Sequence, residues 1–218
     1  MLRPAAVSIT QATEVGTVYT PAELRALADH AHRLGLRVHV DGARLANAAA
    51  HLGCGLREMT TEVGVDVVSL GGTKNGALFA EAIVVVEPAA ATGITYLRKM
   101  DTQLASKMRF LSAQLLALYD GDLWLRCARH ANAMAARLAG GLAGVPGLRL
   151  AQPVQANGIF AAVPPATAEA VRRSHHFYDW GRGRDEVRLM CSWDTTDAAV
   201  DELVAAFQKA AAQPATVG

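Results

Sequence analysis

Residues 20–44, TPAELRALADHAHRLGLRVHVDGAR, indicate the fold class because they join a helix to a buried strand. Thr20, Pro21 and Glu23 form a helix-start signal, with an N-cap hydroxyl, a proline in the first turn and a capping-box carboxylate. Leucines and alanines at helical spacing follow, up to a glycine that ends the helix. Residues 36–40 then have the pattern of a short strand that ends in a carboxylate.

Strands and helices alternate on both sides of this stretch. The predicted strands cover residues 6–10, 36–40 and 65–70, and the predicted helices start at Thr20 and cover 43–63, with a break near 53–55. This alternation predicts a parallel sheet with helical crossovers. Only 11 residues separate Leu70 from Ala82, where the next strand begins, so we expect that strand to run antiparallel to its neighbour.

The rest of the chain changes character. Residues 102–142 predict two long helices that meet at a turn near 120–122. Shorter elements follow, with strands over 148–150, 159–163 and 187–191 and helices over 167–173 and 196–212. We therefore expect an α/β large domain with a mostly parallel sheet over residues 1–125, and a small C-terminal α+β domain over 126–218.

The composition argues against several classes of protein. The 218 residues carry 21 basic and 20 acidic side chains, and they show no concentrated basic face of the kind that binds nucleic acid. No apolar run approaches the ~20 residues that span a bilayer, and the first residues do not have the pattern of a secretory leader. We expect a soluble, cytoplasmic protein that binds neither nucleic acid nor membranes.

Cysteines and histidines do not predict a disulfide framework or a metal site. Cys54, Cys127 and Cys191 are odd in number and far apart, which favours buried thiols. The histidine pairs 30/32 and 175/176 lack an obvious third ligand. We therefore expect no metal.

Three chemically capable features follow or lie within predicted strands. Asp41 ends one strand, with Arg44 three residues further on; Lys74 lies in the glycine-rich loop 69–76 after the next strand; and Arg188 lies in a strand of the small domain. Each has a simpler interpretation alone, as a helix N-cap, a solvated lysine or a surface charge. The loop also lacks the first glycine and the trailing hydroxyl of a nucleotide-binding P-loop.

Together these residues match the needs of pyridoxal phosphate. A carboxylate keeps the ring nitrogen of that cofactor protonated, and a lysine amine holds its aldehyde. An arginine can bind the carboxylate of an amino-acid substrate through two parallel hydrogen bonds. Because the carboxyl ends of neighbouring strands meet at one edge of an open α/β sheet, Asp41 and Lys74 are expected to lie there together.

Longer motifs around these residues resemble a known family. The matching segments are 40–48 (VDGARLANA), 69–76 (SLGGTKNG), 105–110 (ASKMRF), 129–135 (RHANAMA), 177–181 (FYDWG), 187–188 (VR) and 192–196 (SWDTT). They closely resemble the low-specificity L-threonine aldolases, which are β-eliminating lyases among the fold-type I pyridoxal-phosphate enzymes. The resemblance implies an aspartate aminotransferase-like fold, and it covers essentially the whole chain. An aromatic amino-acid β-lyase of the same fold is a weaker alternative, because the 69–76 loop looks specific to the aldolases.

The resemblance implies a role for each candidate residue. Asp41 pairs with the cofactor ring nitrogen, Lys74 holds the cofactor covalently, and Arg44 contacts both the cofactor and the substrate carboxylate. Arg188 is the main carboxylate anchor, and Thr73 helps to position the cofactor. The implied reaction cleaves L-threonine or L-allo-threonine to glycine and acetaldehyde, in a homo-oligomer that is a dimer or tetramer.

The resemblance begins partway into the family pattern. Family members carry a further N-terminal portion that supplies the phosphate-binding helix start and a histidine stacked on the cofactor ring, and we expect this chain to lack both. The alternative is therefore a truncated, catalytically incompetent aldolase fragment, or an assembly partner that keeps the lysine loop.

Overall fold

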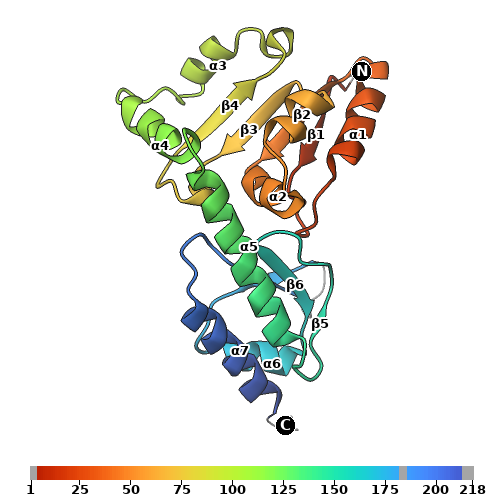
Figure 1. Ribbon diagram of the computed structural model, residues 1–218, viewed down its shortest axis with the longest axis vertical. Coiled ribbons are helices and arrows are strands. Elements are labelled where there is room, and N and C mark those ends of the chain that lie inside the picture. Colours follow the sequence, from red (N-terminus) through yellow and green to blue (C-terminus); the bar gives the residue numbers. More distant parts are fainter. Residues whose placement is uncertain (1–3, 182–185, 213–218) are drawn as a thin grey trace. The chain divides into compact units, whose positions relative to one another are not determined.

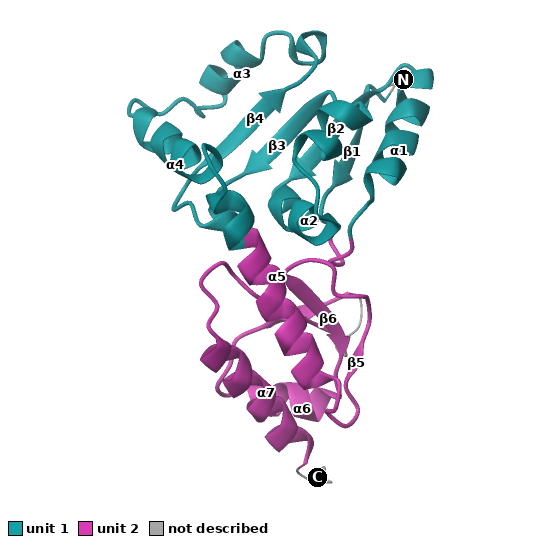
Figure 2. Cartoon of the chain, in the orientation of Figure 1, with its two compact units in different colours: residues 1–13, 18–127 teal, residues 14–17, 128–218 magenta. Residues whose placement is uncertain are grey.

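The computed structural model describes residues 4–181 and 186–212 of the chain (Figure 1). It divides into two compact units (Figure 2). The first comprises Met1–Thr13 and Val18–Cys127, and the second comprises Glu14–Thr17 and Ala128–Gly218.

A four-stranded sheet organises the first unit, in the order β1-β2-β3-β4. Its strands are β1 (Ala6–Thr10), β2 (Arg37–Gly42), β3 (Val67–Gly71) and β4 (Glu81–Val85). The first three run parallel, and β4 runs antiparallel to β3. The predicted mostly parallel sheet is therefore confirmed, including the reversal at β4.

Helices of the first unit follow the predicted rhythm with three differences. They are α1 (Pro21–Arg33), α2 (Leu45–Leu52), α3 (Ile94–Met100), α4 (Arg109–Tyr119) and the start of α5 (Leu123–Leu142), with short 3₁₀ turns η1 (Arg57–Met59), η2 (Thr61–Val63), η3 (Thr73–Asn75) and η4 (Pro88–Ala91). The break predicted near residues 53–55 is confirmed at Gly53, whose φ of 67° ends α2, but beyond it the 3₁₀ turns η1 and η2 replace the helix predicted up to residue 63. The helix predicted from residue 102 begins only at Arg109, and Thr102 itself has a φ of 59°, outside the right-handed helical region. The sequence analysis did not predict α3.

The start of α1 is set by its own residues. The Thr20 hydroxyl accepts a hydrogen bond from the Glu23 backbone N–H at 3.2 Å, and the Glu23 carboxylate accepts one from the Thr20 N–H at 2.8 Å. This reciprocal capping box satisfies two donors that a helix end would otherwise leave unpaired. The predicted helix start at Thr20 is confirmed.

Asp66 ties three elements of the first unit together. Its buried carboxylate accepts hydrogen bonds from the Val38 backbone N–H at 2.7 Å, from Arg37 Nη1 at 3.2 Å and from His32 Nε2 at 2.9 Å. Burial alone would raise the pKa of this carboxyl, but the hydrogen bonds from His32 and Val38 outweigh burial and hold the pKa of Asp66 below its ordinary value. Asp66 therefore stabilises the fold only while it is ionised.

We expect Asp66→Asn to lower the free energy of unfolding by about 2–4 kcal/mol at pH 7, because an amide presents a donor where three donors already converge. The folded-state pKa is depressed, so the wild-type contribution is present above the unfolded pKa and is lost as the pH falls through the folded pKa. Urea denaturation at pH 7 and at pH 3 measures both effects. Exposed Asp29→Asn on α1 is the control, and equal unfolding curves for Asp66→Asn and wild type at pH 7 would contradict this prediction.

The second unit is built around an antiparallel sheet, in the order β5-β6-β8-β7. Its elements are β5 (Arg149–Leu150), β6 (Gly158–Ala162), α6 (Pro165–Arg172), β7 (Tyr178–Trp180), β8 (Glu186–Met190), α7 (Asp197–Ala211) and most of α5. One sheet face packs on the helices through a core that includes Leu138, Ile159, Val187 and Phe207. The sequence analysis predicted these elements except the three-residue strand β7.

Candidate active site

Asp41 and Lys74 lie at the carboxyl ends of neighbouring parallel strands, at the same edge of the first sheet. Asp41 is paired in register with Ser69, one residue before the end of β2. Lys74 lies three residues beyond Gly71, the last residue of β3. The structure thus places the carboxylate and the amine at two adjoining strand ends, where open α/β sheets bind their ligands.

Two glycines let these strand ends approach each other closely. A Cβ atom on Gly42 would lie 2.8 Å from the Ser69 carbonyl oxygen, and one on Gly71 would lie 2.8 Å from the Ala43 Cα atom. Both contacts are with backbone, which cannot swing aside as a long side chain can. The glycines therefore set the spacing between the strand end that carries Asp41 and the loop that carries Lys74.

The loop around Lys74 is anchored on both sides of the lysine. The Thr73 hydroxyl accepts a hydrogen bond from the Ala80 N–H at 3.2 Å and donates one to the Ala80 carbonyl at 3.4 Å. The buried Asn75 side chain donates to the Trp124 carbonyl at 2.8 Å. Lys74 itself is exposed. Its amine therefore projects from a loop whose backbone is held in place by hydrogen bonds of the two neighbouring residues. The Thr73 hydroxyl closes the loop, and its role toward a cofactor stays a prediction.

Asp41 and Arg44 occupy the link between β2 and α2. The half-buried Asp41 carboxylate accepts one hydrogen bond from the Ala43 N–H at 3.1 Å, which leaves it further acceptor capacity. Arg44 immediately precedes α2 and is half-buried, with its Nε atom inside the protein.

Arg188, by contrast, belongs to the second unit, on β8. Its guanidinium carbon lies 4.8 Å from the centre of the Trp180 ring, and its Nε donates to the Met190 sulfur at 3.2 Å. Sequence reasoning gave Trp180 no role of its own. A signal was present in its position within the FYDWG motif, shortly before the strand that carries Arg188.

His39 is a second residue whose place the sequence did not predict. Its Nδ1 is hydrogen-bonded to the Ser8 hydroxyl at 2.8 Å, and its Nε2 is hydrogen-bonded to the Ser69 hydroxyl at 2.9 Å. The imidazole therefore connects β1, β2 and β3 on the sheet face that also carries Asp41, two residues along β2. Alternation of His39 and Asp41 with the valines of β2 was the available signal.

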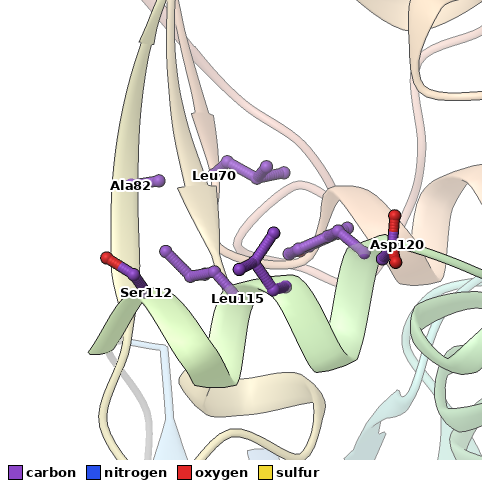
Figure 3. Close-up of a pocket in the computed structure, with 7 residues that line it drawn as sticks. Leu70, Ala82, Ser112, Leu115 and Asp120 are labelled. Carbon is purple, nitrogen blue, oxygen red and sulfur yellow. The ribbon is translucent and has the colours of Figure 1, made fainter. Parts of the chain in front are cut away.

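A separate apolar pocket lies between α4 and the strands β3 and β4 (Figure 3). Its volume is about 440 Å³, and Leu70 and Ala82 on the strands lie opposite Ser112 and Leu115 of the helix. Tyr119 also lines the pocket and donates a hydrogen bond to the Gly71 carbonyl at 2.5 Å. Burial raises the pKa of this phenol well above its ordinary value, so it stays a neutral donor. The pocket has neither the lysine nor the arginines of the candidate site.

The residues at the sheet edge fit the chemical needs of pyridoxal phosphate. A half-buried carboxylate with spare acceptor capacity suits a protonated ring nitrogen, and an exposed amine on an anchored loop suits an aldehyde. A mostly parallel sheet with this pair at adjoining strand ends defines the class of fold-type I pyridoxal-phosphate enzymes.

Comparison with known proteins narrows this class to a family. The family model described as "Beta-eliminating lyase" matches residues 2–164, and the chain belongs to this family of pyridoxal-phosphate-dependent lyases. A low specificity L-threonine aldolase from a Pseudomonas species is 47% identical over 204 residues, which are 93% of this chain. The resemblance predicted from the sequence motifs is therefore confirmed.

Solved structures agree on the fold. A threonine aldolase from Leishmania major superposes with a TM-score of 0.89 at 30% identity, over 97% of this chain. A β-cystathionase from Corynebacterium diphtheriae, described as pyridoxal-phosphate-dependent, shares the fold alone, with a TM-score of 0.74 at 17% identity over 96% of this chain. The chain spans 59% of the Pseudomonas relative, 63% of the Leishmania structure and 59% of the Corynebacterium one.

No helix in the described part of the chain is both long and apolar enough to span a membrane.

Proposed function

We propose that this chain carries the lysine-bearing part of an aldehyde lyase that cleaves L-threonine and L-allo-threonine to glycine and acetaldehyde. The observation that carries the proposal is the placement of Asp41 and Lys74 at adjoining strand ends, in a chain 47% identical to a low specificity L-threonine aldolase. Pyridoxal phosphate, when bound, supplies an acceptor for the electrons of the cleaved carbon–carbon bond.

Each candidate residue has a part in this proposal. The Asp41 carboxylate holds a proton on the cofactor ring nitrogen, and the Lys74 amine binds the cofactor aldehyde and can afterwards carry a proton to or from the substrate. Arg44 and Thr73 contact the cofactor from the two links that follow β2 and β3. Arg188 binds the substrate carboxylate, with Arg44 as a second contact.

Titration of the purified chain with pyridoxal phosphate tests the proposal. We expect a visible absorption band that depends on Lys74 and changes on addition of glycine, together with release of acetaldehyde from L-threonine. A folded chain with no Lys74-dependent band would contradict the proposal, and the alternative of a catalytically incompetent fragment or assembly partner would replace it. The cytoplasmic location stays a prediction from the sequence.

We also propose that the chain functions as a homo-oligomer, a dimer or a tetramer. Large apolar side chains of the loop before β4, of β4 itself, of α3 and of α4 are 60–76% exposed, namely those of Phe79, Ile83, Tyr96, Met100 and Phe110. Monomeric proteins rarely expose so many large apolar groups in neighbouring elements. A second copy of the chain would bury them.

We expect Met100→Lys to raise the dissociation constant of the oligomer at least about 10-fold, because it places a charge in an apolar contact. Sedimentation velocity over a range of concentrations measures this change. Leu34→Lys, at the exposed end of α1, is the matched control and should leave assembly unchanged. A wild-type chain that stays monomeric at high micromolar concentration would contradict the oligomer.

A further inference from the structure

Arg188 is held by apolar and aromatic groups rather than by a carboxylate. Its guanidinium stacks over the Trp180 ring at 4.8 Å, and its Nε donates to the Met190 sulfur at 3.2 Å. Among the described residues, no carboxylate forms an ion pair with it, whereas Arg137 and Arg172 of the same unit are both paired with aspartates. The charge of Arg188 is therefore not neutralised by residues 4–181 or 186–212.

The Trp180 ring packs in turn against the Phe160 ring. It meets the Phe160 ring edge to face, with centres 5.3 Å apart, and Phe160 is only 4% exposed. Gly16 lies against Phe160, because a Cβ atom on Gly16 would be 2.9 Å from the phenyl ring. The positive φ of 81° at Gly16 further favours glycine there. The Arg188 guanidinium is thus supported by three successive groups: the Trp180 indole, the Phe160 phenyl ring and the Gly16 backbone.

Strand register brings these groups onto one sheet face. Phe160 on β6 is the direct cross-strand partner of Arg188 on β8, and Gly158 is the partner of Met190. Val187 and Leu189 alternate with these residues and are buried in the core on the opposite face. Arg188 and Met190 therefore lie side by side on the face that carries the aromatic groups.

The geometry leaves one edge of the guanidinium available. The indole covers one flat face, and the Met190 sulfur occupies the Nε side. Among residues 4–181 and 186–212, no side chain forms a hydrogen bond or ion pair with the Nη1 or Nη2 atoms of Arg188. A carboxylate can form two parallel hydrogen bonds with that Nη1–Nη2 edge.

We infer that Trp180 is a positioning residue: its indole ring holds the Arg188 guanidinium so that the Nη1–Nη2 edge faces the carboxylate of an amino-acid substrate. This inference rests on the proposed role of Arg188 as the carboxylate anchor. A cation held over an indole face loses little further side-chain freedom when it binds, which raises affinity without a new contact to the ligand. Met190 makes the orientation specific, because it blocks side-on binding through Nε.

The test follows the Arg188 Nε–H resonance by NMR in arginine-labelled chain, assigned by its loss in Arg188→Lys. Glycine and acetate are the titrants, with no cofactor present. In the wild type we expect a resonance displaced by the indole ring current and a saturable response to both carboxylates. Trp180→Leu should remove the ring-current displacement and raise the dissociation constant about 3- to 10-fold, with Trp180→Phe in between.

The control Trp193→Leu removes a different tryptophan of the second unit, whose ring does not stack on Arg188, and it should leave the titration unchanged. Circular dichroism of each variant separates loss of fold from loss of positioning, and Trp180→Phe keeps the test decisive if Trp180→Leu does not fold. Equal dissociation constants for Trp180→Leu, Trp180→Phe and wild type would overturn the inference while leaving Arg188 as the anchor. A wild-type Arg188 signal that ignores both carboxylates would instead overturn the anchor role in the proposed function.

Discussion

From the proposed role of Lys74, we expect Lys74→Ala to abolish covalent attachment of pyridoxal phosphate and to lower aldolase turnover at least about 10³-fold, because the substitution removes the amine that would bind the cofactor aldehyde. Lys74 is exposed on a loop whose base is anchored through Thr73 and Asn75, so truncating its side chain removes no packing. The variant should therefore keep its fold, and the loss of attachment and turnover should come from the missing amine alone.

Borohydride reduction followed by peptide mapping measures attachment without any need for turnover. The chain contains four lysines, Lys74, Lys99, Lys107 and Lys209, so the modified peptide identifies the attachment site directly. Lys74→Arg keeps the positive charge but cannot bind the cofactor aldehyde covalently. We therefore expect no more covalent label in Lys74→Arg than in Lys74→Ala. Lys209→Ala, exposed on α7, is the control that should label normally. Label on a different lysine in the wild type would refute the assignment.

The elements that the sequence predicted well are those whose ends are set by neighbouring residues. The capping box of Thr20 and Glu23 starts α1 by contacts that span three residues. The short link before β4 forced its antiparallel direction, because 11 residues cannot return a chain to the same end of a sheet. The start of α1 and the direction of β4 are thus determined by neighbouring residues and by the length of the link, and tertiary packing does not change them.

Elements that depend on distant partners were predicted poorly. The strand β7 has three residues, too few to show alternation, and it exists through its pairing with β8. The late start of α4 at Arg109 was also missed, and the left-handed backbone at Thr102, which is not a glycine, gave no sequence signal.

The same division applies to the candidate site. Asp41 and Lys74 were predictable because each lies at or just beyond the end of a strand, and neighbouring strands bring such residues together. The hydrogen bonds of His39 to Ser8 and Ser69 join residues about 30 positions apart. The support of Arg188 by Trp180 needs the antiparallel pairing of β7 with β8. Residues that hold the reacting groups in place thus become visible only once the strands are paired.

From the proposed role of Asp41, we expect Asp41→Asn to lower the turnover number for L-threonine about 10²- to 10³-fold with little change in KM, because it removes the fixed negative charge that favours movement of electrons into the protonated cofactor ring. The structure indicates that this substitution changes the charge without disturbing the local hydrogen bond. The Asp41 carboxylate accepts its hydrogen bond from the Ala43 N–H at 3.1 Å, and the amide oxygen of an asparagine can accept the same bond. The link between β2 and α2 should therefore keep its conformation.

Steady-state release of acetaldehyde gives turnover and KM, and urea denaturation shows that stability is kept to within about 0.5 kcal/mol. Exposed Asp29→Asn on α1 makes the same chemical change far from the strand ends and should leave turnover unaltered. A rise in KM at constant turnover would mean that Asp41 contributes to binding alone. Wild-type turnover in Asp41→Asn would show that the charge at the end of β2 has no part in the reaction, since carboxylate and amide differ there in little else.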